Sequence, residues 1–162
     1  MKYAGLMEND FNDGEGICVS LWTQGCPHHC PGCHNPETWD FDGGYDVPDD
    51  IKGRIVKAIS ANGITRNFSI LGGEPLCEQN LDFVNNVITS VRTAYPNIKI
   101  YIWSGYTFAE LIERNDHRIQ NILKQADYLI DGKYDDKLRD TTLPLRGSSN
   151  QQIITLDKIK SL

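Results

Sequence analysis

The chain has 162 residues, 40% of them hydrophobic, with a formal net charge of −6 and a pI of about 5.1. Phosphate binding needs clustered Lys and Arg, which this acidic chain lacks, so we expect no nucleic acid as a partner. It contains neither an apolar run of the roughly 18 residues that cross a bilayer nor the basic-then-apolar start of a signal peptide. We therefore expect no membrane partner and one cytoplasmic domain over residues 1–162, with reduced thiols.

Several segments have the pattern of β-strands. The first alternates apolar Ile17, Val19 and Leu21 with other residues, and it runs directly into a loop rich in cysteine and proline. The others are short apolar or alternating runs that end at turn-forming residues. In chain order, the predicted strands cover residues 17–22, 68–71, 98–102, 128–130 and 152–155.

Helical spacing of apolar residues occurs between these strands. Thr107 with Glu110 forms a capping box, and the helix that begins there either continues or breaks near Asn115-Asp116. Asp46 is predicted to cap the helix that follows it. In chain order, the helical stripes cover residues 51–59, 81–91 and 119–126.

Strands that alternate with helices predict parallel βα units with right-handed crossovers. A complete eight-stranded barrel of this kind takes about 250 residues, so this chain closes only part of one. We predict an α/β fold, an open, partial parallel βα barrel of about five to six strands, with its active site at the carboxyl ends of the strands. Unusual segments follow four different predicted strands and would share that rim: the cysteine loop, Gly72-Gly73-Glu74-Pro75, Ser104-Gly105 and Asp131-Gly132-Lys133.

Three of the five cysteines fall within eight residues, at Cys26, Cys30 and Cys33. Prolines and a glycine among them favour an irregular loop that directs three thiols at one centre. Zinc would need a fourth ligand, for which His28, His29 or His34 is available. A disulfide would leave one thiol over. An iron–sulfur cubane takes one cysteine for each iron, so three cysteines would leave one iron open.

The Gly72-Gly73-Glu74-Pro75 segment offers a second feature. Glycines at a strand end allow a ligand close to the backbone, and the Glu74 carboxylate suits an ammonium group. Ser104, after the next strand, can donate to a carboxylate or accept from an amine. A ligand with both groups would satisfy both segments and could also chelate an open iron. The alternative is an ordinary turn with a surface glutamate, and a serine that only forms a turn.

The cysteine spacing followed by Gly72-Gly73-Glu74-Pro75 resembles the radical S-adenosylmethionine enzymes. Within that superfamily, further runs are similar to the activating proteins of anaerobic ribonucleoside-triphosphate reductase, and the resemblance covers nearly the whole chain. These runs are Trp22–Cys26, Cys33–Trp39, Asp131–Tyr134 and Arg146–Gln151.

This resemblance implies a four-iron, four-sulfur cluster whose open iron is chelated by the amino and carboxylate groups of S-adenosylmethionine. One electron would cleave that cofactor to methionine and a 5′-deoxyadenosyl radical, which takes a hydrogen atom from a glycine of the reductase. Glu74 would accept the ammonium group, and no catalytic side chain is implied beyond the cluster and the cofactor. The cluster ligands would be Cys26, Cys30 and Cys33, and the cofactor site Gly32, Cys33, His34, Gly72, Gly73, Glu74 and Ser104.

Gly32 departs from the superfamily pattern, because many members have an aromatic residue just before the third cysteine. Adenine stacking is therefore expected from elsewhere, with His34 or Trp103 as the choices. Cys18 and Cys77 lie outside the motif. Cys18 is expected to be a small core residue, and no role is predicted for Cys77.

The implied partners are anaerobic ribonucleoside-triphosphate reductase, which would cover the open side of the barrel, and a one-electron donor such as reduced flavodoxin. The charged segment 133–140, expected to be a solvated loop, and the run 146–151 are predicted to contact the reductase. One alternative is the activation of another glycyl-radical enzyme, of the formate-lyase type. A zinc-stabilised binding module without catalysis is the alternative from another class.

Overall fold

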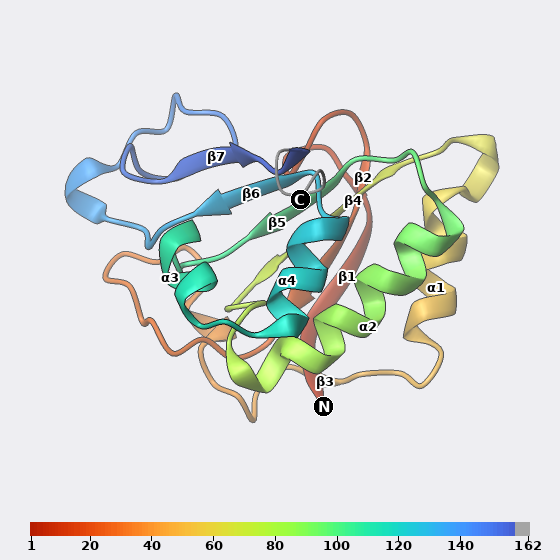
Figure 1. Cartoon of the computed structure of the whole chain (residues 1–162), viewed down its shortest axis with the longest axis horizontal. Helices are drawn as coiled ribbons and strands as arrows, with labels where there is room; N and C mark the ends of the chain where they lie inside the picture. Colours follow the sequence, from red (N-terminus) through yellow and green to blue (C-terminus); the bar gives the residue numbers. More distant parts are fainter. Residues whose placement is uncertain (158–162) are drawn as a thin grey trace.

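The computed structural model of this chain describes residues 1–157, which form one seven-stranded sheet with helices packed against it (Figure 1). The strands lie across the sheet in the order β3-β1-β2-β4-β5-β6-β7. Their bounds are β1 Lys2–Asp10, β2 Cys18–Thr23, β3 Tyr45–Asp46, β4 Asn67–Gly72, β5 Ile100–Trp103, β6 Tyr128–Asp131 and β7 Gln152–Thr155. The helices are α1 Ile51–Ile59, α2 Glu78–Ala94, α3 Phe108–Glu113 and α4 His117–Gln125, with short 3-10 turns at Pro36–Thr38, Ala61–Gly63 and Asp136–Leu138.

The central strands β2, β4, β5 and β6 run parallel, as the alternation of strands and helices predicts. β7 pairs antiparallel with β6, because the intervening residues 132–151 form a loop with one short turn rather than a crossover helix. β1 pairs antiparallel with β2 at the other side. The predicted α/β fold with an open, largely parallel sheet is confirmed. β1 and β3 raise the strand number above the five to six expected.

β1 and β3 escape prediction because long-range pairing rather than local pattern forms them. Met7 and the two residues after it are exposed, so β1 lacks a sustained apolar alternation, and β3 has only two residues. The prediction that Asp46 caps α1 is wrong. Asp46 lies in β3, where its Oδ1 is 2.8 Å from Lys2 Nζ, and Asp50 is the residue that precedes α1.

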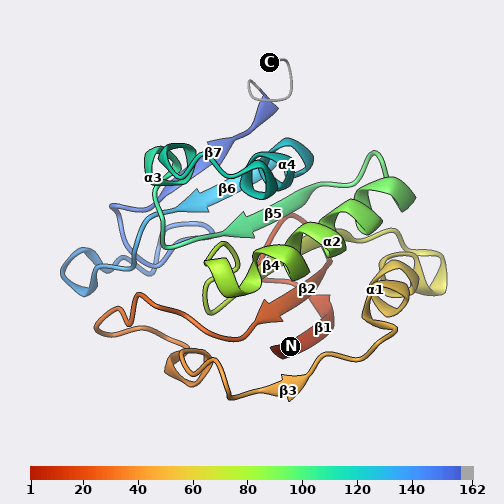
Figure 2. The same cartoon turned by 60° about the horizontal axis from the view of Figure 1, so that its bottom comes forward.

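The hydrophobic core lies between the sheet and the helices, which cover one face of the sheet (Figures 1 and 2). Alternate residues of the central strands point into it and are fully buried, as period-two alternation requires. The predicted helical stripes of α1, α2 and α4 supply the opposite layer. Within residues 1–157 no helix has the length and apolarity that a bilayer span requires. The core strand residues include Val19, Leu21, Phe68, Ile70, Ile100 and Ile102.

The chain between β5 and β6 forms two helices rather than one. Thr107 Oγ1 accepts from the backbone N–H of Glu110 at 3.2 Å, and the Glu110 side chain accepts from the Thr107 N–H, which confirms the predicted capping box. The helix then breaks at Asn115, whose φ of +48° is left-handed. Asp116 caps α4 by accepting from the Arg118 N–H at 2.8 Å.

The other face of the sheet is largely covered at its amino-terminal end by the β1–β2 hairpin loop, residues 11–17. Ser69 Oγ donates to the carbonyl oxygen of Asp13. The backbone N–H of Glu15 donates to the Tyr101 hydroxyl at 3.1 Å. Gly14 has a φ of +144°, and a Cβ there would lie only 3.0 Å from the Tyr101 ring. The hairpin loop thus packs against one end of this inner face, and the carboxyl ends of the strands lie at the other.

Candidate functional site

The carboxyl ends of the parallel strands meet at one rim, as predicted. After β4, the backbone N–H of Gly73 donates to Thr23 O at 3.0 Å, and that of Glu74 donates to Gly25 O at 2.8 Å. These bonds join the end of β4 to the end of β2. The ends of β5 and β6 are linked by the bond from Gly132 N to Tyr106 O, at 3.3 Å. The bond from Gly105 N to Glu74 Oε1, at 2.6 Å, joins these two pairs, so the four predicted segments are contiguous.

The cysteine loop is anchored at both ends and at one internal turn. Gly25 N donates to Thr38 O at 2.7 Å and Cys26 N to Trp39 O at 3.1 Å, so the chain before and after the loop is held together. Inside the loop, Cys33 N donates to Cys30 O at 3.1 Å. Gly32 lies in this turn with a φ of +77°, a left-handed conformation that glycine adopts without strain.

Three histidines of this region each pack against an aromatic ring from another segment. His28 contacts Tyr106 edge-on, with ring centroids 4.6 Å apart. His29 stacks on Trp39 at 4.6 Å and 11° between the ring planes. His34 lies 5.3 Å from the ring of Tyr134. These ring contacts thus hold the loop that carries the cysteines against the rim and against residues 132–151, hereafter the β6–β7 loop.

All five cysteines are free thiols, which rules out a disulfide within the described chain. Cys30 and Cys33 are half-buried, and Cys26 is 8% exposed. Burial raises the pKa of the Cys26 and Cys30 thiols. A bound metal would supply the positive charge that deprotonates a coordinating thiol. Across residues 1–157, no three or more His, Cys, Asp or Glu side chains close around a single ion. Three thiols spaced along one loop are the donor set of a cluster, in which each thiolate binds its own iron.

Glu74 is fully buried, and its carboxylate accepts four hydrogen bonds. Oε1 accepts from Gly105 N at 2.6 Å and lies 2.7 Å from His28 Nε2, which must carry the proton because a carboxylate only accepts. Oε2 accepts from Leu76 N at 2.8 Å and from Ser104 Oγ at 2.9 Å. Burying a carboxylate is costly unless donors surround it. This glutamate is therefore a built anionic site, and the alternative of a surface glutamate in a turn is wrong.

Ser104 and the two glycines of this segment have specific structural roles. The Ser104 hydroxyl donates to Glu74 and accepts from Tyr106 N at 3.1 Å, so it supports the carboxylate. Gly72 has a φ of +119°. A Cβ at Gly73 would lie 2.8 Å from Thr38 O. The close backbone approach predicted for a ligand at Gly73 is thus made by the chain's own backbone.

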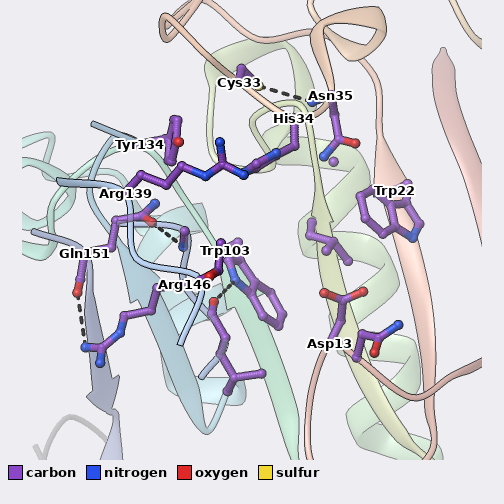
Figure 3. Close-up of a pocket in the computed structure, with 16 residues that line it drawn as sticks. Asp13, Trp22, Cys33, His34, Asn35, Trp103, Tyr134, Arg139, Arg146 and Gln151 are labelled. Atoms are coloured by element: carbon purple, nitrogen blue, oxygen red, sulfur yellow. Dashed lines mark hydrogen bonds between the residues drawn. The ribbon is translucent and has the colours of Figure 1, made fainter. Parts of the chain in front are cut away.

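A cavity of about 480 Å³ lies beside the rim, between the cysteine loop and the β6–β7 loop (Figure 3). Of the predicted cofactor residues, Cys33, His34 and Gly72 line it. Trp103, the other candidate for adenine stacking, also lines it and donates from Nε1 to Leu145 O at 2.8 Å. Among the described residues, Gly73, Glu74 and Ser104 lie within the rim rather than in this lining.

Sequence reasoning missed several residues of the cavity wall. Asp13, Trp22 and Arg139 contribute side chains to it, as do Arg146 and Gln151 (Figure 3). Of the described side chains, Trp22 Nε1 and Arg146 Nε are buried donor atoms without a hydrogen-bond partner. The sequence contains Trp22 and Arg146 in runs that carry the family resemblance, but a motif alone does not show which way its side chains point.

The β6–β7 loop is tied together across its width. Arg139 and Ser148 form an isolated antiparallel bridge, and Ser149 N donates to Leu138 O at 2.9 Å. Ser148 is fully buried, and its hydroxyl accepts from Asp135 N at 3.1 Å. Segments 133–140 and 146–151, predicted as separate contact regions, are therefore one unit that forms a wall of the cavity.

Comparison with known proteins agrees with this geometry. A family model described as a 4Fe-4S single cluster domain matches residues 12–154. The anaerobic ribonucleoside-triphosphate reductase-activating proteins of Vibrio cholerae serotype O1 and Pasteurella multocida are each 34% identical to the chain over 154 residues, which is 94% of this chain and 97% and 96% of theirs. The protein of that name from Escherichia coli K12 is 32% identical over 94% of this chain and 97% of its own.

The fold, the thiol triplet and the matched family model define a single-cluster iron–sulfur domain of the radical S-adenosylmethionine class. Within that class, the similar proteins reported above all have the same name. The chain belongs to the family of anaerobic ribonucleoside-triphosphate reductase-activating proteins.

Proposed function

We propose that this chain activates anaerobic ribonucleoside-triphosphate reductase by using a [4Fe–4S] cluster and S-adenosylmethionine to generate a glycyl radical on it. The observation that carries the proposal is the buried Glu74 carboxylate on the same rim as three free thiols. An anion ringed by donors suits the cofactor's ammonium group, and the thiols suit iron. The names of the related proteins support the choice of the reductase over a formate-lyase type of partner.

Cys26, Cys30 and Cys33 would hold the cluster, and the anchored ends of their loop would fix its position relative to Glu74. When bound, the cluster and S-adenosylmethionine together supply the one-electron reductive chemistry that ends in removal of a hydrogen atom from glycine. The chain's own residues would orient the cofactor and shield it from water. Glu74 would accept the ammonium group, and Ser104 would hold Glu74 in place.

Of the remaining cofactor residues, Cys33, His34 and Gly72 border the cavity. Gly32, Cys33 and His34 would run along the adenosyl group with Gly72 opposite, and Gly73 would hold the end of β4 against Gly25 and Thr38. His34 and Trp103 both border the cavity, which supports either of them as the residue that would stack on adenine. The aromatic lining would also exclude water from the reacting atoms.

The β6–β7 loop would meet the reductase, since it forms a wall of the cavity and its charged residues Lys137 and Arg139 are exposed. A one-electron donor such as reduced flavodoxin would supply the electron, in the cytoplasm, where thiols stay reduced. We propose one domain over residues 1–162, which the single sheet and the family match over residues 12–154 support.

The test is anaerobic reconstitution with iron and sulfide, followed by mixing with a chemical reductant, S-adenosylmethionine and the reductase. A glycyl-radical signal in electron paramagnetic resonance is expected with the reductase and not with a formate-lyase type enzyme. Cys30→Ser, which removes one thiol of the triplet, is the matched control and should give no signal. A reconstituted protein that is colourless and binds zinc would instead support the binding-module alternative.

A further inference from the structure

The Glu74 carboxylate has no free acceptor position in this structure. Two oxygens offer about four lone-pair sites, and four donors occupy them at 2.6 to 2.9 Å. Any ammonium group that binds Glu74 must therefore take the place of one of these donors.

Three of the four donors belong to the rim itself. Leu76 N and Gly105 N are backbone groups, one after β4 and the other after β5. The Ser104 hydroxyl is buried and also accepts from Tyr106 N. Of the described residues, His28 alone reaches Glu74 from the cysteine loop. Moving its side chain would give up the edge-on contact with Tyr106 but none of the other three bonds to Glu74.

We propose that His28 is an internal placeholder for the ammonium group at Glu74, and that the amine of S-adenosylmethionine replaces it when the cofactor binds. This inference rests on the proposed function. The imidazole N–H gives the buried carboxylate a fourth donor, at 2.7 Å, where an ammonium N–H would otherwise be needed. The side chain of His28 is 6% exposed, so the contact is shielded from water.

Gly105 makes room for the His28 ring. A Cβ built at Gly105 would lie 2.7 Å from His28 Nε2 and 2.5 Å from Cδ2, so any other residue at this position would push the ring away. Gly105 does not have a left-handed backbone, so the need for glycine is one of space. The space beside Glu74 Oε1 therefore holds one donor group in addition to the Gly105 N–H.

His28 also links cofactor binding to the cysteine loop, because it lies between Cys26 and Cys30. Replacing it by the cofactor frees the loop at this point, while the His29–Trp39 stack and the anchored ends still hold it. When one of the protein's own side chains fills a binding site, the ligand can bind only those molecules in which the site is open. The apparent affinity for the ligand is then lower. Removing His28 should therefore tighten binding of the cofactor.

The experiment measures S-adenosylmethionine affinity by calorimetry on anaerobically reconstituted protein of equal iron content. His28→Ala should bind about tenfold more tightly than the wild type, the factor expected when one competing hydrogen bond to a charged group is lost. His117→Ala is the matched control, because it removes an exposed histidine of α4 that belongs neither to the rim nor to the cysteine loop. Its affinity should equal that of the wild type.

Gly105→Ala supplies a second, independent test. Its methyl group would occupy the space beside His28 Nε2 that an ammonium group must also use, so this variant should bind the cofactor more weakly, alone and combined with His28→Ala. An analogue of S-adenosylmethionine that lacks the amino group should bind wild type and His28→Ala equally, because it cannot compete for Glu74.

The outcomes separate the two proposals. Wild-type protein that does not bind S-adenosylmethionine would overturn the proposed function and the placeholder together. Normal binding to the wild type with unchanged or weaker binding to His28→Ala would overturn the placeholder alone, since His28 would then be a support for Glu74 rather than its competitor.

Discussion

Two carboxylate sites, one at the rim and one where β1 meets the hairpin loop, have surroundings that differ in kind. At the rim, Glu74 is ringed by four hydrogen-bond donors. At the hairpin end, Asp13 lies beside a second carboxylate, Asp10, which is 2% exposed and accepts from Ser20 Oγ and from Asn12 N at 2.8 Å.

Electrostatics at the hairpin end follow from this pairing. Burial, together with the neighbouring Asp10, raises the pKa of Asp13 to about 7. Burial also acts to raise the pKa of Asp10, but hydrogen bonds from Asp13, Ser20 and backbone N–H groups outweigh it and lower the value. The comparison teaches that the surroundings decide the role. Donors around a carboxylate favour its charged form, whereas a neighbouring carboxylate favours its protonated form.

The largest expected effect is on iron content, and it distinguishes Cys30 at the rim from Cys18 at the hairpin end. Cys30→Ser removes a thiol of the triplet, so we expect loss of most bound iron after anaerobic reconstitution, measured by iron assay and by the visible absorbance of the cluster. Cys18→Ser, at the buried hairpin end, should keep the iron content of the wild type. Equal loss in both variants would contradict the assignment of the cluster to the rim, and Cys77→Ser is a further control.

Glu74→Gln should destabilise the metal-free protein by about 2 kcal/mol, because the new amide NH₂ would face buried donors that lose their acceptor. Urea denaturation measures the free energy of unfolding. Ser104→Ala, which removes one of the four donors, should cost less, about 1 kcal/mol. A Glu74→Gln variant as stable as the wild type would show that the rim site does not depend on its charge.

Asp13→Asn should change the free energy of unfolding about as little as Ser104→Ala does, and at high pH it should stabilise the protein rather than destabilise it. An acid whose pKa is raised from 3.8 to about 7 in the folded state costs stability as pH rises through that interval. The variant should therefore be more stable than the wild type by about 1 kcal/mol at pH 8, a value reduced for partial exposure, and the gain should shrink towards pH 5. Denaturation at both pH values measures it.

The control for this pH dependence is Asn12→Ser, which changes an exposed residue of the same hairpin loop and neither removes nor adds a titratable group. Its effect on stability should be similar at pH 5 and pH 8. If the Asp13→Asn gain were the same at both pH values, the two carboxylate sites would not differ in the way described.

The sequence predicts the parts of this fold that are coded locally. Apolar spacing identifies the parallel strands and the helices of the core, and the capping box at Thr107 marks where α3 begins. The rim follows from topology, because the carboxyl ends of parallel strands share one edge. β1 and β3 could not be found in this way, since hydrogen bonds to distant strands rather than their own composition define them.

The candidate site also has parts that are coded locally and parts that depend on long-range contacts. The thiol triplet and Glu74 are visible in the sequence, because their spacing and neighbouring glycines are unusual. The contact of His28 with Glu74 spans 46 residues, and the bridge between Arg139 and Ser148 depends on how one loop folds back. Neither has a local pattern, so the four donors around Glu74 and the cavity wall formed by the β6–β7 loop required the structure.

Strand order also bears on how the protein is made. From β4 onward, neighbours in the sheet follow each other in the chain, so each strand can add to an existing edge during synthesis. The thiols emerge early, whereas Glu74 comes 46 residues after His28 and Gly105 a further 31. At about 5–20 residues per second this delay lasts about 4 to 15 s. During it the nascent cysteine loop lacks the contact of His28 with Glu74, and only Thr38 and Trp39 are there to anchor its ends.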